Sequence, residues 1–144
     1  MLDKDLYNLL EPVVAFGPIA LDADNTPAAI DLDGYRSALL LICVGVGGIT
    51  FDATNKVEFK LTHSEDNSTY VAVADADVVG VTVGSGGIVK SLVSAHAAAS
   101  VTEVGYIGGK RYLKVLADFS GTHGAATPMA AIVVKGAAET LPSA

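Results

Sequence analysis

The clearest pattern along the chain is an alternation of hydrophobic and polar residues with a period of two. In residues 56–63, Val57, Phe59 and Leu61 alternate with polar side chains. Residues 111–119 repeat this alternation, and residues 69–74 and 101–107 are also strand-like. A period of two places successive side chains on opposite faces of a strand. These segments therefore predict half-buried strands of antiparallel sheets.

Turn-forming residues separate these strands in two places. Residues 64–68 are polar and lie between 56–63 and 69–74, which predicts a β-hairpin with a loop of four or five residues. Gly108 and Gly109 lie between residues 101–107 and 111–119. This second glycine-rich turn predicts a second hairpin.

Two continuous apolar runs, residues 37–46 and 129–134, predict central strands that are covered on both faces. Shorter strands are expected at 28–32, 78–83 and 87–93, and at 12–21, where Gly17 and Pro18 favour a bend or a sheet edge. Eight or nine strands and no sustained helical pattern favour an all-β fold. We expect an antiparallel β-sandwich or jelly-roll-like single domain.

The two ends of the chain differ from this central region. Leu6, Leu9 and Leu10 have helical spacing, so residues 1–11 are interpreted as an N-terminal arm or short helix. Residues 12–136 form the expected sandwich domain. Residues 137–144, which include Pro142, are interpreted as a C-terminal tail.

Composition adds a first indication of function. Hydrophobic residues make up 51% of the chain and charged residues only 17%, against a usual charged fraction of about 25%. This excludes disorder and suggests that other subunits cover part of the surface. The net charge of −7 and the lack of a basic cluster larger than Lys110-Arg111 argue against a nucleic-acid partner. We also expect no membrane segment, no signal peptide, and synthesis in a cytoplasm.

Local motifs for chemistry are not found. The segment around Ser85 has Val83 where a nucleophile elbow needs its first glycine, and the three histidines have no metal-ligand spacing. Cys43, the single cysteine, is expected to be a buried, inert thiol. Aspartates at 22–24, 31–33 and 75–77 fit either a weak calcium site or solvated turns, and the sequence leaves both open. We expect a protein that is not an enzyme and has no cofactor and no metal.

One segment resembles a known group of proteins. Residues 104–115 have the sequence Val-Gly-Tyr-Ile-Gly-Gly-Lys-Arg-Tyr-Leu-Lys-Val, and residues 31–38 and 61–70 carry two further similar motifs. Together they resemble small proteins encoded beside the major capsid protein in tailed bacteriophages and prophages. The resemblance extends over roughly residues 28–136.

This resemblance implies a virion structural protein, most specifically a head decoration (cement) protein. Such a protein stabilises the outside of the capsid by binding the major capsid protein. The resemblance also implies a homo-oligomer, with a trimer favoured, located on the capsid exterior after synthesis in the host cytoplasm. Two alternatives remain: a tail- or spike-associated virion protein, and a carbohydrate-binding jelly-roll module. The absence of tryptophan argues against the glycan binder.

Two sets of residues are candidates for the capsid or subunit interface. The first is the set of leucines in the arm: Leu2, Leu6, Leu9 and Leu10. The alternative for these leucines is that they cover the chain's own core. The second set is Arg111 and Tyr112, residue types that are enriched at binding hot spots. The alternative for Arg111 is a solvated charge at a hairpin tip.

Overall fold

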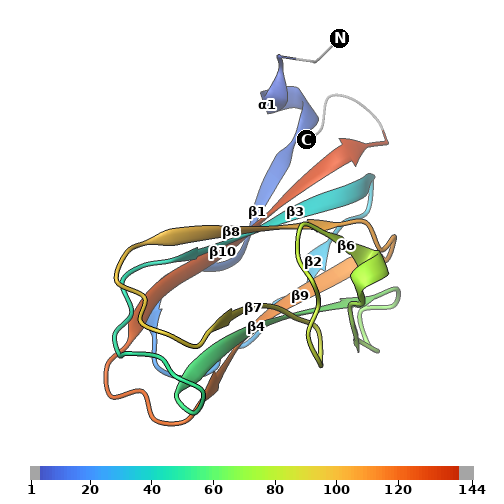
Figure 1. The fold of residues 1–144 in the computed structure, drawn as a ribbon. Coiled ribbons are helices and arrows are strands. Elements are labelled where there is room, and N and C mark those ends of the chain that lie inside the picture. The colour runs from blue at the N-terminus through green and yellow to red at the C-terminus, as the bar shows by residue number, and fades with distance from the viewer. Residues whose placement is uncertain (1–3, 140–144) are drawn as a thin grey trace.

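A computed structural model describes residues 4–139, and these residues form two antiparallel sheets packed face to face (Figure 1). Sheet A has the strand order β1-β10-β3-β8-β6. Sheet B has the order β2-β9-β4, and both β5 and β7 pair with the remaining edge of β4. The elements are α1 (Leu6–Leu9), β1 (Glu11–Leu21), β2 (Ile30–Asp31), β3 (Tyr35–Val44), β4 (Lys56–Ser64), β5 (Val71–Ala72), η1 (Asp75–Asp77), β6 (Val78–Val79), β7 (Ile88–Leu92), β8 (Ser100–Tyr106), β9 (Tyr112–Ser120) and β10 (Thr127–Ala138).

The topology is that of a jelly roll with one excursion. If the two-residue strands β5 and β6 are set aside, β1-β10-β3-β8 faces β2-β9-β4-β7. Most strands that follow each other in sequence lie in opposite sheets, and the eight strands form two four-stranded layers. The expected all-β sandwich is therefore confirmed. The excursion, residues 71–87, pairs first with β4 and then with β8 before it returns to β4.

The core lies between the sheets, where the alternating positions point inward. Val57, Phe59 and Leu61 of β4 are completely buried. They lie against the inward-facing residues of sheet A, which include Leu40 and Ile42 of β3. The period-two pattern of the sequence thus identified the buried face of β4 correctly.

The first predicted hairpin is confirmed, although its loop, residues 65–70, has six residues rather than four or five. The second predicted hairpin is wrong. β4 pairs with β5 through Thr62 and His63, as expected. By contrast, β8 pairs with β3 and β6 in sheet A, whereas β9 pairs with β4 and β2 in sheet B. Residues 107–111 therefore form an arch between the sheets rather than a hairpin turn.

The physical reason for the arch is the ring of Tyr106 at the end of β8. A Cβ atom on Gly108 would lie 2.8 Å from the Tyr106 hydroxyl oxygen, and Gly109 has a positive φ of +77°. The backbone N–H of Lys110 donates a hydrogen bond to that hydroxyl oxygen at 3.1 Å. The glycines let the chain cross over the buried tyrosine and reach the other sheet.

Three further expectations are corrected. The inner faces of β3 and β10 are buried, but their outer faces are not covered by any part of the chain from residue 4 to residue 139. Cys43 points to this outer side and is exposed, so the expectation of a buried thiol is wrong. At the ends of the domain, β1 begins at Glu11 and β10 continues to Ala138. Both strands therefore extend slightly past the predicted limits 12–136.

Replacing a central core residue should strongly destabilise the fold. We expect Phe59→Ala to lower the free energy of unfolding by about 3–5 kcal/mol, because it leaves a cavity between the sheets. Val71→Ala on β5 is the control: Val71 is 45% exposed, so its loss should cost less than about 0.5 kcal/mol. Urea denaturation of both variants measures the difference. Similar losses for the two variants would contradict this packing.

Candidate interaction surface

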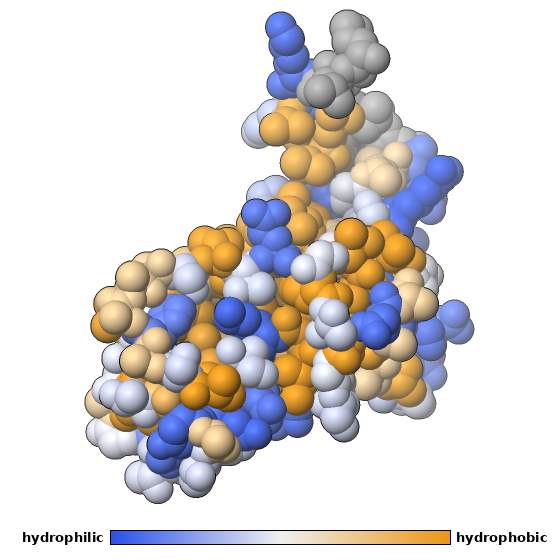
Figure 2. Space-filling view, in the orientation of Figure 1, coloured by the Kyte–Doolittle hydropathy of each residue, from blue (hydrophilic) through white to orange (hydrophobic). Residues whose placement is uncertain are grey.

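The N-terminal arm projects from one end of the sandwich, which we call the arm end (Figure 1). Its helix α1 is capped by the Asp5 carboxylate, which accepts a hydrogen bond from the backbone N–H of Asn8. No residue of α1 is buried, and the side chains of Leu6 and Tyr7 are 60% and 89% exposed. Figure 2 shows hydrophobic side chains on this projection. The arm is thus an apolar surface that does not belong to the chain's own core.

The four arm leucines occupy different environments. Leu6 is exposed, Leu9 is half-buried, and Leu10 is 36% exposed and lies next to Gly136 of β10. Leu2 lies outside the described residues. None of the three described leucines belongs to the core between the sheets or packs against it. The alternative that they cover the chain's own core therefore gains no support from the structure.

A polar cluster fixes the base of the arm. The hydroxyl group of Tyr35 on β3 donates a hydrogen bond to the Glu11 carboxylate at 2.5 Å. The Lys135 ammonium group on β10 lies 3.2 Å from the same carboxylate and 4.7 Å from the centre of the Tyr35 ring. The Tyr35 hydrogen bond and the Lys135 charge hold the pKa of Glu11 below its usual value. The arm therefore leaves the sheet at a defined place.

Arg111 and Tyr112 lie at the same end but on the other sheet. The Arg111 guanidinium donates two hydrogen bonds to the Asp31 carboxylate, both at 2.9 Å. It also lies 5.1 Å from the centre of the Tyr112 ring. Arg111 is therefore held by β2 and is not a free charge at a hairpin tip. The guanidinium lowers the pKa of Asp31 to about 2.

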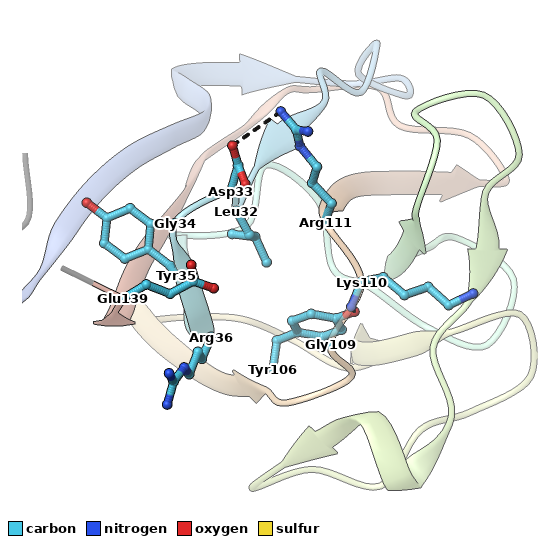
Figure 3. Close-up of a pocket in the computed structure, with 10 residues that line it drawn as sticks. All are labelled: Leu32, Asp33, Gly34, Tyr35, Arg36, Tyr106, Gly109, Lys110, Arg111 and Glu139. Atoms are coloured by element: carbon cyan, nitrogen blue, oxygen red, sulfur yellow. Dashed lines mark hydrogen bonds and ion pairs between the residues drawn. The ribbon is translucent and has the colours of Figure 1, made fainter.

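A shallow hollow of about 300 Å³ lies between the loop after β2 and the arch after β8. Figure 3 shows how its side chains are arranged: Leu32 and Tyr106 lie against it, and Arg111 points toward Asp33. Its lining has charges of both signs and includes no serine, cysteine or histidine. The lining residues are Leu32, Asp33, Gly34, Tyr35, Arg36, Tyr106, Gly109, Lys110, Arg111 and Glu139. The polar groups that line this hollow are therefore carboxylates, phenols, an ammonium group and guanidinium groups.

A buried polar pair lies beneath this hollow. His63 is 4% exposed, and its Nδ1 atom lies 2.7 Å from the hydroxyl oxygen of Tyr106. Burial lowers the pKa of His63 and raises the pKa of Tyr106, so both side chains are neutral near pH 7. Because the tyrosine oxygen also accepts the Lys110 N–H, the pair holds the arch in place.

The aspartate-rich loops use their side chains to hold backbone groups. Asp24 accepts a hydrogen bond from the Phe119 N–H, Asp75 from the Val83 N–H, and Asp77 from the Ala74 N–H. Between residues 4 and 139 there is no group of three or more His, Cys, Asp or Glu side chains that could hold a metal ion. Asp77 thus acts within its own turn, whereas Asp75 and Asp24 hold backbone groups that are eight and 95 residues away in the sequence.

The largest feature that the sequence reasoning missed is the outer face of sheet A. Residues that pair directly across an antiparallel sheet point to the same side, so the strand register defines three rows on this face. The rows are Pro12–Val134–Leu39–Gly105–Val79, Val14–Ile132–Leu41–Glu103 and Ala130–Cys43–Val101. Glu103 is the single charged residue in these rows.

Several residues of this outer face are strongly exposed. Val14 is 60%, Val101 61%, Val79 56% and Ile132 37% exposed. The continuous apolar runs in the sequence could have indicated this apolar outer face, because both alternating positions of β3 and β10 are apolar. The sequence interpretation assumed that the chain itself covers both faces, whereas its described part covers only one.

Comparison of the chain with protein-family models, curated proteins and solved structures found no match. In the part of the chain that the structure describes, no helix has the length and apolar character needed to cross a membrane.

The Asp31–Arg111 pair should be visible in a pH titration. The lowered pKa means that the pair stabilises the fold above the ordinary aspartate pKa of about 3.9 and loses this effect as the pH falls through about 2. In an NMR titration we expect a midpoint of about 2 for the Asp31 carboxyl group, rising toward 3.9 in Arg111→Gln. Lys110→Gln is the control and should leave the midpoint unchanged. An equally low midpoint in Arg111→Gln would contradict the assignment.

Proposed function

We propose that this protein is a non-enzymatic structural component of a tailed-phage virion, which decorates the outside of the capsid and stabilises it by binding the major capsid protein. The observation that carries the proposal is the apolar outer face of sheet A. A protein that works alone seldom leaves such a face in water, and contiguous apolar patches commonly mark interaction sites. This fits a chain whose working state is an assembly.

The resemblance of residues 104–115 to proteins encoded beside the major capsid protein indicates which assembly this is. In the structure these residues form the end of β8, the arch over Tyr106 and the start of β9. The arch of this segment, which includes Arg111, and the adjoining Tyr112 thus lie at the surface of the arm end. We propose that this end faces the capsid shell.

Arg111 and Tyr112 suit such a contact. The ion pair with Asp31 and the contact with the Tyr112 ring already restrict the guanidinium. A side chain that is ordered before binding loses less conformational entropy in the complex. The shell is stabilised by mass action, because the protein binds the assembled shell better than free capsid subunits. The chain needs no catalytic group for this role.

The test is to mix the purified chain with shells that lack it. We expect co-sedimentation at a fixed copy ratio and a higher melting temperature of the shell. Tyr112→Ala should weaken binding by about tenfold or more, as expected for an anchor residue in an interface. Val46→Ala, at an exposed site at the opposite end of the sandwich, is the control and should bind normally.

Two results together would contradict the capsid role. If the chain remains in the supernatant and the shell melts at an unchanged temperature, the capsid role is wrong. Binding to isolated tails would then favour a tail component, and binding in a glycan screen would favour the carbohydrate-binding module.

A further inference from the structure

Two apolar surfaces of this chain are left uncovered by its described residues. One is the arm, with Leu6 60% and Tyr7 89% exposed. The other is the outer face of sheet A, with its three apolar rows. Each surface costs free energy when it is exposed to water, in proportion to its apolar area.

The arm does not cover the outer face of its own chain. Helix α1 stands beyond the end of β1 and points away from the sandwich (Figure 1). The polar cluster of Glu11, Tyr35 and Lys135 holds the base of the arm, and Leu10 rests beside Gly136. In this arrangement Leu6 and Tyr7 remain exposed.

The size of the outer face supports a partner that also contributes its arm. With strands about 4.8 Å apart and a rise of about 3.4 Å per residue, the three rows cover roughly 400 Å². A stable interface buries about 800 Å² on each partner. Two sheet faces alone therefore fall short of a standard interface, and the arm supplies additional apolar area.

Each of the two surfaces carries charged residues that the contact has to accommodate. Glu103 is the single charge in the three rows and is exposed. The arm carries Lys4, an exposed residue and the only Lys or Arg before Arg36. Lys4 lies between two aspartates in the sequence, and the Asp5 carboxylate keeps its charge because the Asn8 groups that donate to it are neutral. Lys4 is therefore the one arm side chain that can form an ion pair with Glu103, and the apolar residues rather than the net charge of the arm favour the contact.

We propose that the N-terminal arm of one copy packs across the outer face of sheet A of a second copy, with Leu6 and Tyr7 on the apolar rows and Lys4 toward Glu103. The contact is heterologous, because an arm meets a sheet face, and it is compatible with reciprocal exchange or with a closed ring. It does not depend on the proposed function, because it concerns only the association of the chain with itself.

The first test is a mixing experiment followed by light scattering. Leu6→Asp removes the arm contact, and Ile132→Asp removes the face contact. We expect each variant alone to associate at least about tenfold more weakly than the wild-type chain. Mixed together they should form one-to-one dimers, because the intact arm of one variant can dock on the intact face of the other. Val71→Asp places the same charge at an exposed site on sheet B and should associate normally.

Three results would overturn the proposal: a wild-type chain that is monomeric at high concentration, a Leu6→Asp variant that associates as tightly as wild type, or a mixture that stays monomeric when both single variants are folded and monomeric. Circular dichroism establishes folding in each case. None of these results involves a capsid shell, so they are distinguishable from a failure of the decoration role.

A crosslinking experiment gives a second measurement, in which the contact is captured as a covalent link. Tyr7→Cys adds a thiol on the arm, and the native Cys43 lies in the third row of the face. A short bis-maleimide should then yield a covalent dimer in which mass spectrometry finds position 7 joined to Cys43. Val71→Cys is the control and should give no such dimer. If position 7 is never joined to Cys43, the arm does not lie on this face.

Discussion

The organisation of this protein depends on one constraint. A sheet has two faces, and residues 4–139 cover only one face of sheet A. β3 over residues 38–44 and β10 over residues 128–134 are apolar at both alternating positions, so neither face of these two strands is suited to contact with water. The inner faces form the core with sheet B, where Leu40, Ile42, Ala131 and Val133 are buried. The outer faces have no such cover from residues 4–139. An apolar strand of this kind is typical of a layer that lies between two others.

The apolar part and the charged part of the surface lie in different places. The outer face of sheet A is almost free of charge, whereas the arm end concentrates ion pairs around Glu11, Asp31 and Arg111. Apolar faces favour tight association but do little to fix the orientation of the two partners. Fixed charges favour one defined orientation. A subunit of a larger assembly needs both. In our account the apolar face joins copies of the chain, and the arm end is directed to the shell.

Much of the fold could be predicted from the sequence where the information is local. The alternation around Phe59 identified β4 and its buried face, and the polar residues after Ser64 identified the first hairpin. The arch after β8 could not be predicted, because Gly108 and Gly109 permit either a hairpin or a crossing between sheets. Which one forms depends on the burial of Tyr106 against His63, a contact between residues far apart in sequence. The exposure of Cys43 was missed for a related reason, since an apolar run does not say what covers it.

The most direct measurement of the central claim is the reactivity of the Cys43 thiol, which lies within the outer face of sheet A. The rate of its reaction with a maleimide should be followed as the concentration of the unmodified chain is raised. Our account predicts fast modification in dilute solution and a fall in rate as the chains associate and cover the face. A rate that stays constant while light scattering shows association would place the contact elsewhere and contradict the account.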